Sequence, residues 1–324
     1  MKRRQVILAA AALAVAPQLR AQAEKMRRLG ILSTSRAQTA EELARSPFLI
    51  KLRDLGWVEG RNLRIERRNI TAASELPQAA RELAALKLDV VYAIGGPSIS
   101  IAKQEITGIP IVIFSVGDPI RAGHVKSLAR PEGNITGVAG FARDLASKRV
   151  ALLKETVPRM KRAALLGNPA QPMLKETVPD LLQRARAIGV ELRLFEIANP
   201  AALEPAFAAM AREAIDGLIE LPDPMLHGQI PRIVELAARY RLPAIHERRE
   251  FAEGAGLMAY GADYDELARS LAVYIDRILK GAKPGDLPIE QPTKFELVIN
   301  LKTAKALGLK IPQSVLLRAD RVIE

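Results

Sequence analysis

The residues of this chain that could do chemistry are small polar groups that follow predicted strands in both halves of the sequence. Those expected to contact a ligand are Ser33, Thr34, Gly96, Pro97, Ser98, Asp118, Asn168, Asp223 and Tyr260, together with Glu250. Hydroxyl groups and the free N–H groups at helix N-termini bind a carboxylate. A carboxylate such as that of Asp118 or Asp223 binds an ammonium group. Both kinds of group in one cleft would fit a zwitterion such as an amino acid.

These residues also have a purely structural interpretation. Asp118 and Asp223 each precede a proline, and an Asp-Pro pair often begins a turn or caps a helix without touching a ligand. The stretch 95–98, Gly-Gly-Pro-Ser, would present N–H groups to an anion, but it also fits an ordinary turn between a strand and a helix. Both interpretations stay open at this point.

Sequence signals for catalysis or metal binding are absent. The histidines, His124, His227 and His246, lack the spacing of metal ligands and are expected at the surface or at strand ends. The chain has no cysteine, which excludes disulfides and thiol chemistry. It also has no phosphate-binding loop, nucleophile elbow or dinucleotide-binding glycine pattern. We therefore predict a protein that is not an enzyme and uses no cofactor or metal ion.

The elements that must position these residues alternate between strand and helix along the chain. Short apolar, β-branched runs bounded by turn residues predict the strands 28–32, 63–66, 89–94, 109–114 and 135–139, then 161–166, 190–197, 216–221, 242–246, 257–260 and 295–299. Helical periodicity fills most of the intervals. This alternation is typical of parallel sheets with right-handed crossovers.

The stretch 109–141 organises the rest of the chain. Its first strand, 109–114, is apolar enough to be buried on both faces. Ligands of open α/β sheets bind beyond the carboxyl ends of the strands, so 116–118 is a candidate binding loop. A helix is expected over 120–129, and residues 135–141 are expected to form the first hinge.

The two halves of the sequence share one register. Leu76 precedes Asp89 by thirteen positions, as Leu203 precedes Asp216, and each aspartate lies eight positions before a proline. Because several such matches share one order and a nearly constant offset, they indicate a duplicated unit. We predict an α/β fold of two similar, doubly wound parallel-sheet lobes.

A later helix complicates the division into lobes. The helix expected over 265–279 follows the second half of the sequence, and we expect it to return to the first lobe. This return gives several chain crossings and therefore a hinge. We assign 24–140 and 262–287 to the N-terminal lobe and 141–261 and 288–324 to the C-terminal lobe.

The N-terminus carries an export signal. A basic start at residues 1–4, an apolar run over 6–16 and Ala21-Gln22-Ala23 predict a signal peptide, residues 1–23, cleaved after Ala23 in the periplasm. Arg3-Arg4 leaves the twin-arginine route open. The formal net charge of +12 is spread among acidic residues, without a basic run interleaved with aromatics, so nucleic-acid binding is not expected.

Several segments resemble one known family. They are SVGDPIRAGHVKSLARPEGNITGV (115–138), LLGNP (165–169), LIELPDPM (218–225), EFAEGAGLMAYGADYDELAR (250–269) and LVINLKTAKALGLKIPQSVLLRAD (297–320). The chain resembles ABC-transporter substrate-binding proteins with the type I periplasmic-binding-protein fold over nearly its whole length after the signal. Some relatives look like binders of tryptophan or other aromatic amino acids.

The resemblance implies a small ligand held between the lobes and passed to an ABC permease in the inner membrane. We expect a monomeric periplasmic solute-binding component that works by hinge closure. Two alternatives stay open: a two-lobed α/β enzyme with Asp118 or Asp223 as base, and a ligand-sensing module for a membrane receptor.

Overall fold

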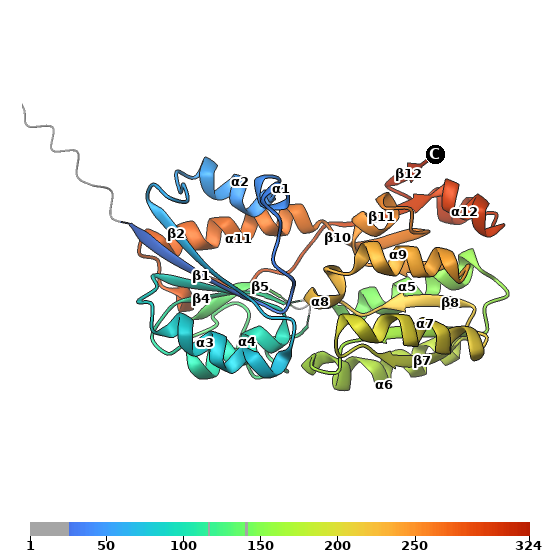
Figure 1. Ribbon diagram of the computed structural model, residues 1–324, viewed down its shortest axis with the longest axis horizontal. Helices are drawn as coiled ribbons and strands as arrows, with labels where there is room; N and C mark the ends of the chain where they lie inside the picture. The colour runs from blue at the N-terminus through green and yellow to red at the C-terminus, as the bar shows by residue number, and fades with distance from the viewer. Residues whose placement is uncertain (1–25, 116, 140–141) are drawn as a thin grey trace, which may run out of the picture.

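Two α/β lobes lie side by side in the computed structural model, which describes residues 26–115, 117–139 and 142–324 (Figure 1). The predicted signal peptide, Val116 of the predicted binding loop and residues 140–141 of the predicted first hinge lie outside the described residues. Within the described part of the chain, no helix is long and apolar enough to cross a membrane.

The first lobe contains one parallel sheet with the strand order β2-β1-β3-β4-β5. Its strands are β1 (Arg27–Ser33), β2 (Leu63–Asn69), β3 (Val90–Ile94), β4 (Ile111–Ser115) and β5 (Ile135–Ala139). The helices are α1 (Ala40–Ala44), α2 (Pro47–Asp54), α3 (Leu76–Ala84), which follows the short η1 (Ala73–Glu75), and α4 (Gly96–Glu105).

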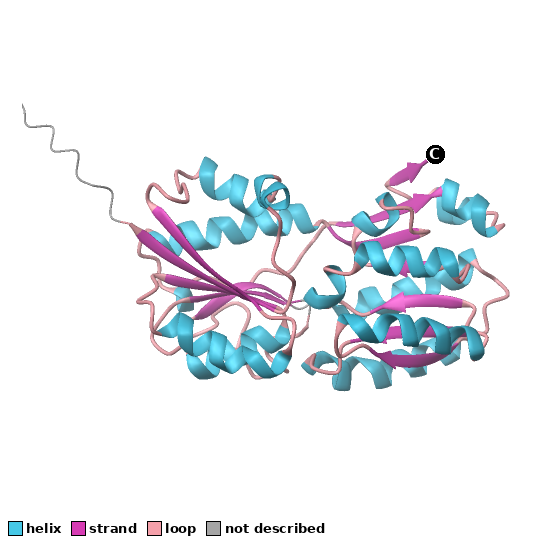
Figure 2. Cartoon of the chain, in the orientation of Figure 1, coloured by secondary structure: helices cyan, strands magenta, loops and turns pink. Residues whose placement is uncertain are grey.

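The apolar runs of the central strands are explained by helices on both faces of this sheet (Figure 2). Along β3, Tyr92 faces the core with α2 and α11 (Tyr264–Leu279), whereas Val91 and Ala93 face the core with α3 and α4. Because side chains alternate between the two faces of a strand, both sets must be apolar.

The second lobe contains a larger sheet with the order β12-β11-β10-β9-β8-β6-β7. Its strands are β6 (Arg162–Gly167), β7 (Glu191–Glu196), β8 (Gly217–Glu220), β9 (Ala244–His246), β10 (Met258–Ala262), β11 (Phe295–Asn300) and β12 (Arg321–Ile323). One core includes α5 (Ala142–Thr156), α6 (Pro172–Ala187), α12 (Leu301–Leu307) and α13 (Gln313–Leu316). The other includes α7 (Leu203–Arg212), α8 (Pro224–His227), α9 (Ile230–Arg239) and α10 (Arg249–Glu253), with η2 (Pro200–Ala202) before α7.

The predicted repeat is confirmed by the strand order. β7, β6, β8, β9 and β10 occupy the places of β2, β1, β3, β4 and β5. The matched aspartates make the same contacts: Asp89 Oδ2 accepts from Arg28 N at 2.8 Å, and Asp216 Oδ2 accepts from Arg162 N at 3.0 Å. In both lobes this contact fixes the start of the central strand against its neighbour.

The second sheet departs from the prediction at one pair, because β10 and β11 run antiparallel. The cause is the path of the chain. β10 ends where the chain leaves for the first lobe, and β11 begins where the chain returns from it. Because one strand ends and the next begins at the same edge of the sheet, the two strands run in opposite directions.

The prediction of a helix over 120–129 is wrong, since the chain forms only turns and bends there. Asp118 Oδ1 accepts from the N–H groups of Ile120 and Arg121, and the N–H groups of His124 and Val125 both donate to the Pro119 carbonyl. Gly123 has φ +69, a left-handed conformation through which an α-helix cannot continue.

Chain crossings join the lobes after β5, after β10 and before β11. Figure 1 shows α11, in orange, lying among the blue elements of the first lobe. The last crossing runs beside β5, where Ala139 N donates to the Glu290 carbonyl at 3.0 Å. The predicted boundaries at single residues stay predictions.

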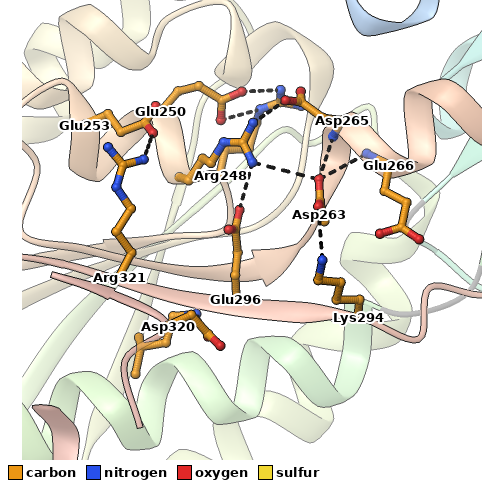
Figure 3. Close-up of polar contacts among 12 residues, drawn as sticks. Arg248, Glu250, Glu253, Asp263, Asp265, Glu266, Lys294, Glu296, Asp320 and Arg321 are labelled. Atoms are coloured by element: carbon orange, nitrogen blue, oxygen red, sulfur yellow. Dashed lines mark hydrogen bonds and ion pairs between the residues drawn. The ribbon is translucent and has the colours of Figure 1, made fainter. Parts of the chain in front are cut away.

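The start of α11 ties two of these crossings together (Figure 3). Asp263 caps the helix by accepting from the N–H groups of Asp265 and Glu266, and its other oxygen lies 4.0 Å from Lys294 Nζ, just before β11. Arg249 on α10 pairs with Asp265. The hinge is therefore a braced junction rather than a single tether.

Candidate ligand-binding site

A cavity of about 870 Å³ lies between the lobes. The first lobe contributes the carboxyl ends of β1, β3 and β4 and the start of α4, and the second lobe contributes the loops before α6, α8 and α10. This volume is within the usual range of small-molecule sites, roughly 300–1,000 Å³. The two sets of strand ends therefore face one shared cleft, as the repeat predicts.

The predicted contact residues divide into two groups. Those that line the cleft are Ser33, Gly96, Asp118 and Asp223, together with Glu250. Those that do not line it, although the structure describes them, are Thr34, Pro97, Ser98, Asn168 and Tyr260. Tyr260 packs instead against the core of the second lobe, and its carbonyl accepts from Arg149. The role of each residue toward a ligand stays a prediction.

The start of α4 is suited to an anionic group. Gly95 precedes the helix with φ 85 and ψ 153, and no side chain caps the helix. Nearby, the hydroxyls of Ser98, within the first turn, and Thr34, after β1, are buried and have no hydrogen-bond partner among the described residues. Because these two hydroxyls do not line the cleft, the feature that favours an acceptor such as a carboxylate is the uncapped helix start at Gly95 and Gly96, which does line it.

Asp223 serves as both a cap and a cleft residue. Its Oδ1 accepts from Leu226 N at 2.9 Å, which caps α8, and its Oδ2 accepts from Gln171 Nε2 at 2.6 Å and Asn168 Nδ2 at 3.0 Å. Burial raises the pKa of Asp223 against the effect of these donors. Asn168 therefore acts by holding Asp223, and a cation entering the cleft would favour the charged carboxylate.

Aromatic side chains form a wall that sequence reasoning did not identify. Tyr92 on β3, Phe114 on β4 and Tyr264 at the start of α11 all line the cleft. The rings of Phe114 and Tyr264 pack edge to face with their centroids 5.7 Å apart. The position of Phe114 at the end of a predicted strand could have marked it as a cleft residue. Tyr264 joins the wall only because α11 returns to the first lobe.

A buried group of charged residues under the cleft was also missed. Arg149 on α5 is fully buried near Glu220 and Glu247, and His246 Nε2 lies 2.5 Å from Glu220 Oε2. His227 pairs with Glu247. These contacts join residues far apart in the sequence, which spacing alone cannot reveal.

The expected surface or strand-end positions of the histidines hold only for His246, which ends β9. His124 is buried, with Nε2 3.0 Å from Ser100 Oγ, and burial lowers its pKa to about 4. His227 ends α8 and lines the cleft. The prediction is wrong for His124 because it packs in the interior, and for His227 because its pairing with Glu247 leaves it largely covered.

Glu247 makes the fold sensitive to acid. Burial by itself raises the pKa of Glu247, but His227, Arg149 and His246 outweigh it and bring that pKa to about 2. A carboxyl group whose pKa is lower in the folded chain than in the unfolded chain stabilises the fold at pH values above its unfolded pKa. This stabilisation is lost as the pH falls to the pKa of the folded chain. We expect a loss of roughly 3 kcal/mol between about pH 5 and pH 2.

Urea unfolding measured at several pH values tests this expectation. In a Glu247→Gln variant the side chain no longer titrates, so the dependence of stability on pH over that range should become shallower. An unchanged slope would show that other carboxyls cause the acid sensitivity.

The sequence pattern of the ABC transporter substrate binding protein family matches residues 38–323. The chain belongs to this family. ABC transporter substrate-binding proteins bind small solutes and work with ABC permeases, and they are not enzymes. This assignment overrules the enzyme alternative and confirms the resemblance seen in the sequence. It also confirms the type I periplasmic-binding-protein fold.

Individual members show how similar this chain is to studied substrate-binding proteins. A tyrosine-binding protein of Clostridioides difficile is 27% identical over 270 residues, 82% of this chain and 77% of its own length. A Streptococcus pneumoniae domain solved in complex with L-Trp is 25% identical, with a TM-score of 0.80 over 92% of this chain and 100% of its own. A ligand-free, open substrate-binding protein with adhesive properties from Clostridium difficile is also 25% identical, with a TM-score of 0.59 over 92% of this chain and 99% of its own.

Proposed function

We propose that this chain binds a single amino acid with an aromatic or large apolar side chain between its lobes. The observation that carries the proposal is the division of the cleft into three environments. The α4 N-terminus suits the carboxylate. Asp223 and Asp118 suit the ammonium group, and the aromatic wall suits the side chain. The amino-acid ligands of the two relatives named above support the same class.

The mechanism we propose is closure of the two lobes on the ligand. The L-Trp complex and the open, ligand-free protein are equally similar in sequence and coverage, yet their TM-scores to this chain are 0.80 and 0.59. This contrast supports a closed arrangement here. Contacts between the lobes support it too, since a Cβ atom on Gly95 would lie 2.7 Å from Pro224 Cγ, and one on Gly228 would lie 3.5 Å from Arg36 Cγ. A ligand that contacts both lobes stabilises the closed state.

We further propose that the chain is exported to the periplasm, with cleavage after Ala23, and acts there as a monomer that delivers its ligand to an inner-membrane ABC permease. The basic start, short apolar run and Ala-x-Ala site support export, and membership of the family supports the permease as partner.

Thermal unfolding in the presence of candidate ligands tests the binding proposal. A ligand that binds only the folded chain stabilises it by about 2.7 kcal/mol at a hundredfold excess over the dissociation constant. We expect aromatic amino acids to raise the melting temperature. The matching amines and the matching acids without an amino group should do so less, because each leaves one charged environment of the cleft unpaired.

The proposal is contradicted if none of the amino acids raises the melting temperature while a solute of another class does. Isothermal titration would then identify the stoichiometry and affinity of that class.

A further inference from the structure

Arg248 belongs to the second lobe, and its guanidinium stacks on Tyr264 in the aromatic wall of the first lobe. Among the described residues it is the one arginine with such a ring contact. It follows β9, lines the cleft, and places its Cζ 4.4 Å from the centre of the Tyr264 ring. Tyr264 in turn packs into the core of the first lobe and against Phe114. The Arg248 charge also acts on the buried hydroxyl of Tyr92. The guanidinium is therefore at the side of the cleft where a ligand's ring would lie.

Glu250 holds this guanidinium in a fixed orientation. Arg248 Nη2 donates to Glu250 Oε1 at 2.8 Å, and Arg248 Nε donates to Oε2 at 3.3 Å (Figure 3). This two-point contact occupies one edge of the planar fork. The remaining nitrogen, Nη1, carries two N–H groups for which the described residues provide no hydrogen-bond acceptor. The structure thus presents an oriented donor without a partner.

The chemistry of the missing acceptor follows from the charge of this pair. Glu250 already neutralises the Arg248 cation, and the pKa of Glu250 is lowered to about 2 because Arg248 outweighs the effect of burial. A second full negative charge on the same guanidinium would lie close to the Glu250 carboxylate and be repelled by it. An uncharged oxygen accepts the hydrogen bond without that cost.

We propose that Arg248 determines specificity by donating from Nη1 to an uncharged oxygen at the far end of the ligand's aromatic side chain. The preferred ligand is then an amino acid whose ring bears a hydroxyl, and the ring without it is disfavoured because Nη1 would stay unpaired in the closed cleft. This inference rests on the proposed function and deepens it. Arg248 also couples recognition to closure, since it belongs to one lobe and stacks on the other.

The test is a cycle of two ligands and two proteins. L-tyrosine and L-phenylalanine differ by the single oxygen in question, and isothermal titration gives their affinities for the unchanged chain and for Arg248→Met. We expect the unchanged chain to prefer L-tyrosine roughly 10- to 100-fold. In Arg248→Met that ratio should fall to about one through loss of tyrosine affinity. Arg248→Lys should recover part of the preference, because an ammonium group still donates.

Arg239→Met is the matched control. Arg239 ends α9, pairs with Glu235 and Glu204 at the surface, and does not line the cleft. Its loss should leave the tyrosine-to-phenylalanine ratio unchanged. If the ratio in the unchanged chain is near one, or survives in Arg248→Met, the specificity proposal fails while amino-acid binding stands. If neither amino acid nor any other binds the unchanged chain, the proposed function fails instead.

Discussion

A Gly95→Ala variant is expected to bind its ligand roughly 10- to 100-fold more weakly than the unchanged chain. The added Cβ atom would lie 2.7 Å from Cγ and 3.1 Å from Cδ of Pro224, which begins α8 on the opposite lobe. Contacts this short force the lobes apart. Since Gly95 and Pro224 belong to opposite lobes, we expect the substitution to act on the proposed closure. Isothermal titration with an aromatic amino acid measures the loss, and small-angle scattering measures whether the ligand still compacts the chain.

The backbone at Gly95 requires a matched control, because φ 85 is costly for alanine whatever the space around it. Gly60 has φ +84 and nothing within 4 Å of an added Cβ. Gly60→Ala should therefore lose stability similarly and keep its affinity. Adding Pro224→Ala to Gly95→Ala should restore part of the affinity by removing the opposing ring atoms. Equal affinities for the two alanine variants would contradict closure by this contact.

An Arg149→Met variant is expected to lose about 3–5 kcal/mol of stability. Arg149 is fully buried, and its charge faces the buried carboxylates of Glu247 and Glu220. Methionine fills much of the same space but leaves these carboxylates without their cation. Removing one partner of a buried charge group is costly for that reason, even where the whole group adds little. Urea unfolding at neutral pH gives the change.

Lys148→Met is the control for this variant, because Lys148 precedes Arg149 on the same helix and is exposed. It should change stability by less than about 0.5 kcal/mol. If Arg149→Met unfolds too readily to be measured, adding Glu247→Gln should recover a folded chain by removing the uncompensated carboxylate. A stable Arg149→Met without the second change would show that the carboxylates are balanced by the histidines instead.

Local signals in the sequence were enough for much of the fold. Apolar runs such as 109–114 predict strands covered on both faces, and the matched Asp89 and Asp216 predict two equivalent lobes. Asp223 was likewise recognisable from its place after a strand. The helix predicted over 120–129 failed because Gly123 and the cap at Asp118 favour turns over its helical periodicity.

What the sequence could not predict depends on pairs that are distant along the chain. Arg149 meets Glu247 across about a hundred positions, and Tyr264 meets Phe114 across about 150. Arg248 and Glu250 are near neighbours, yet their pattern is that of an exposed charged helix start. Only the stacking of Arg248 on a ring from the other lobe distinguishes it from such a surface pair.

The place of α11 in the first lobe determines when that lobe can be completed during synthesis. The helix covers one face of a sheet whose strands end at Ala139, yet it is not finished until Leu279 has been added. Until then Leu29, Val90 and Val112 lack much of their cover. A growing polypeptide therefore cannot complete the core of its first lobe until residue 279 of its 324 residues has been added.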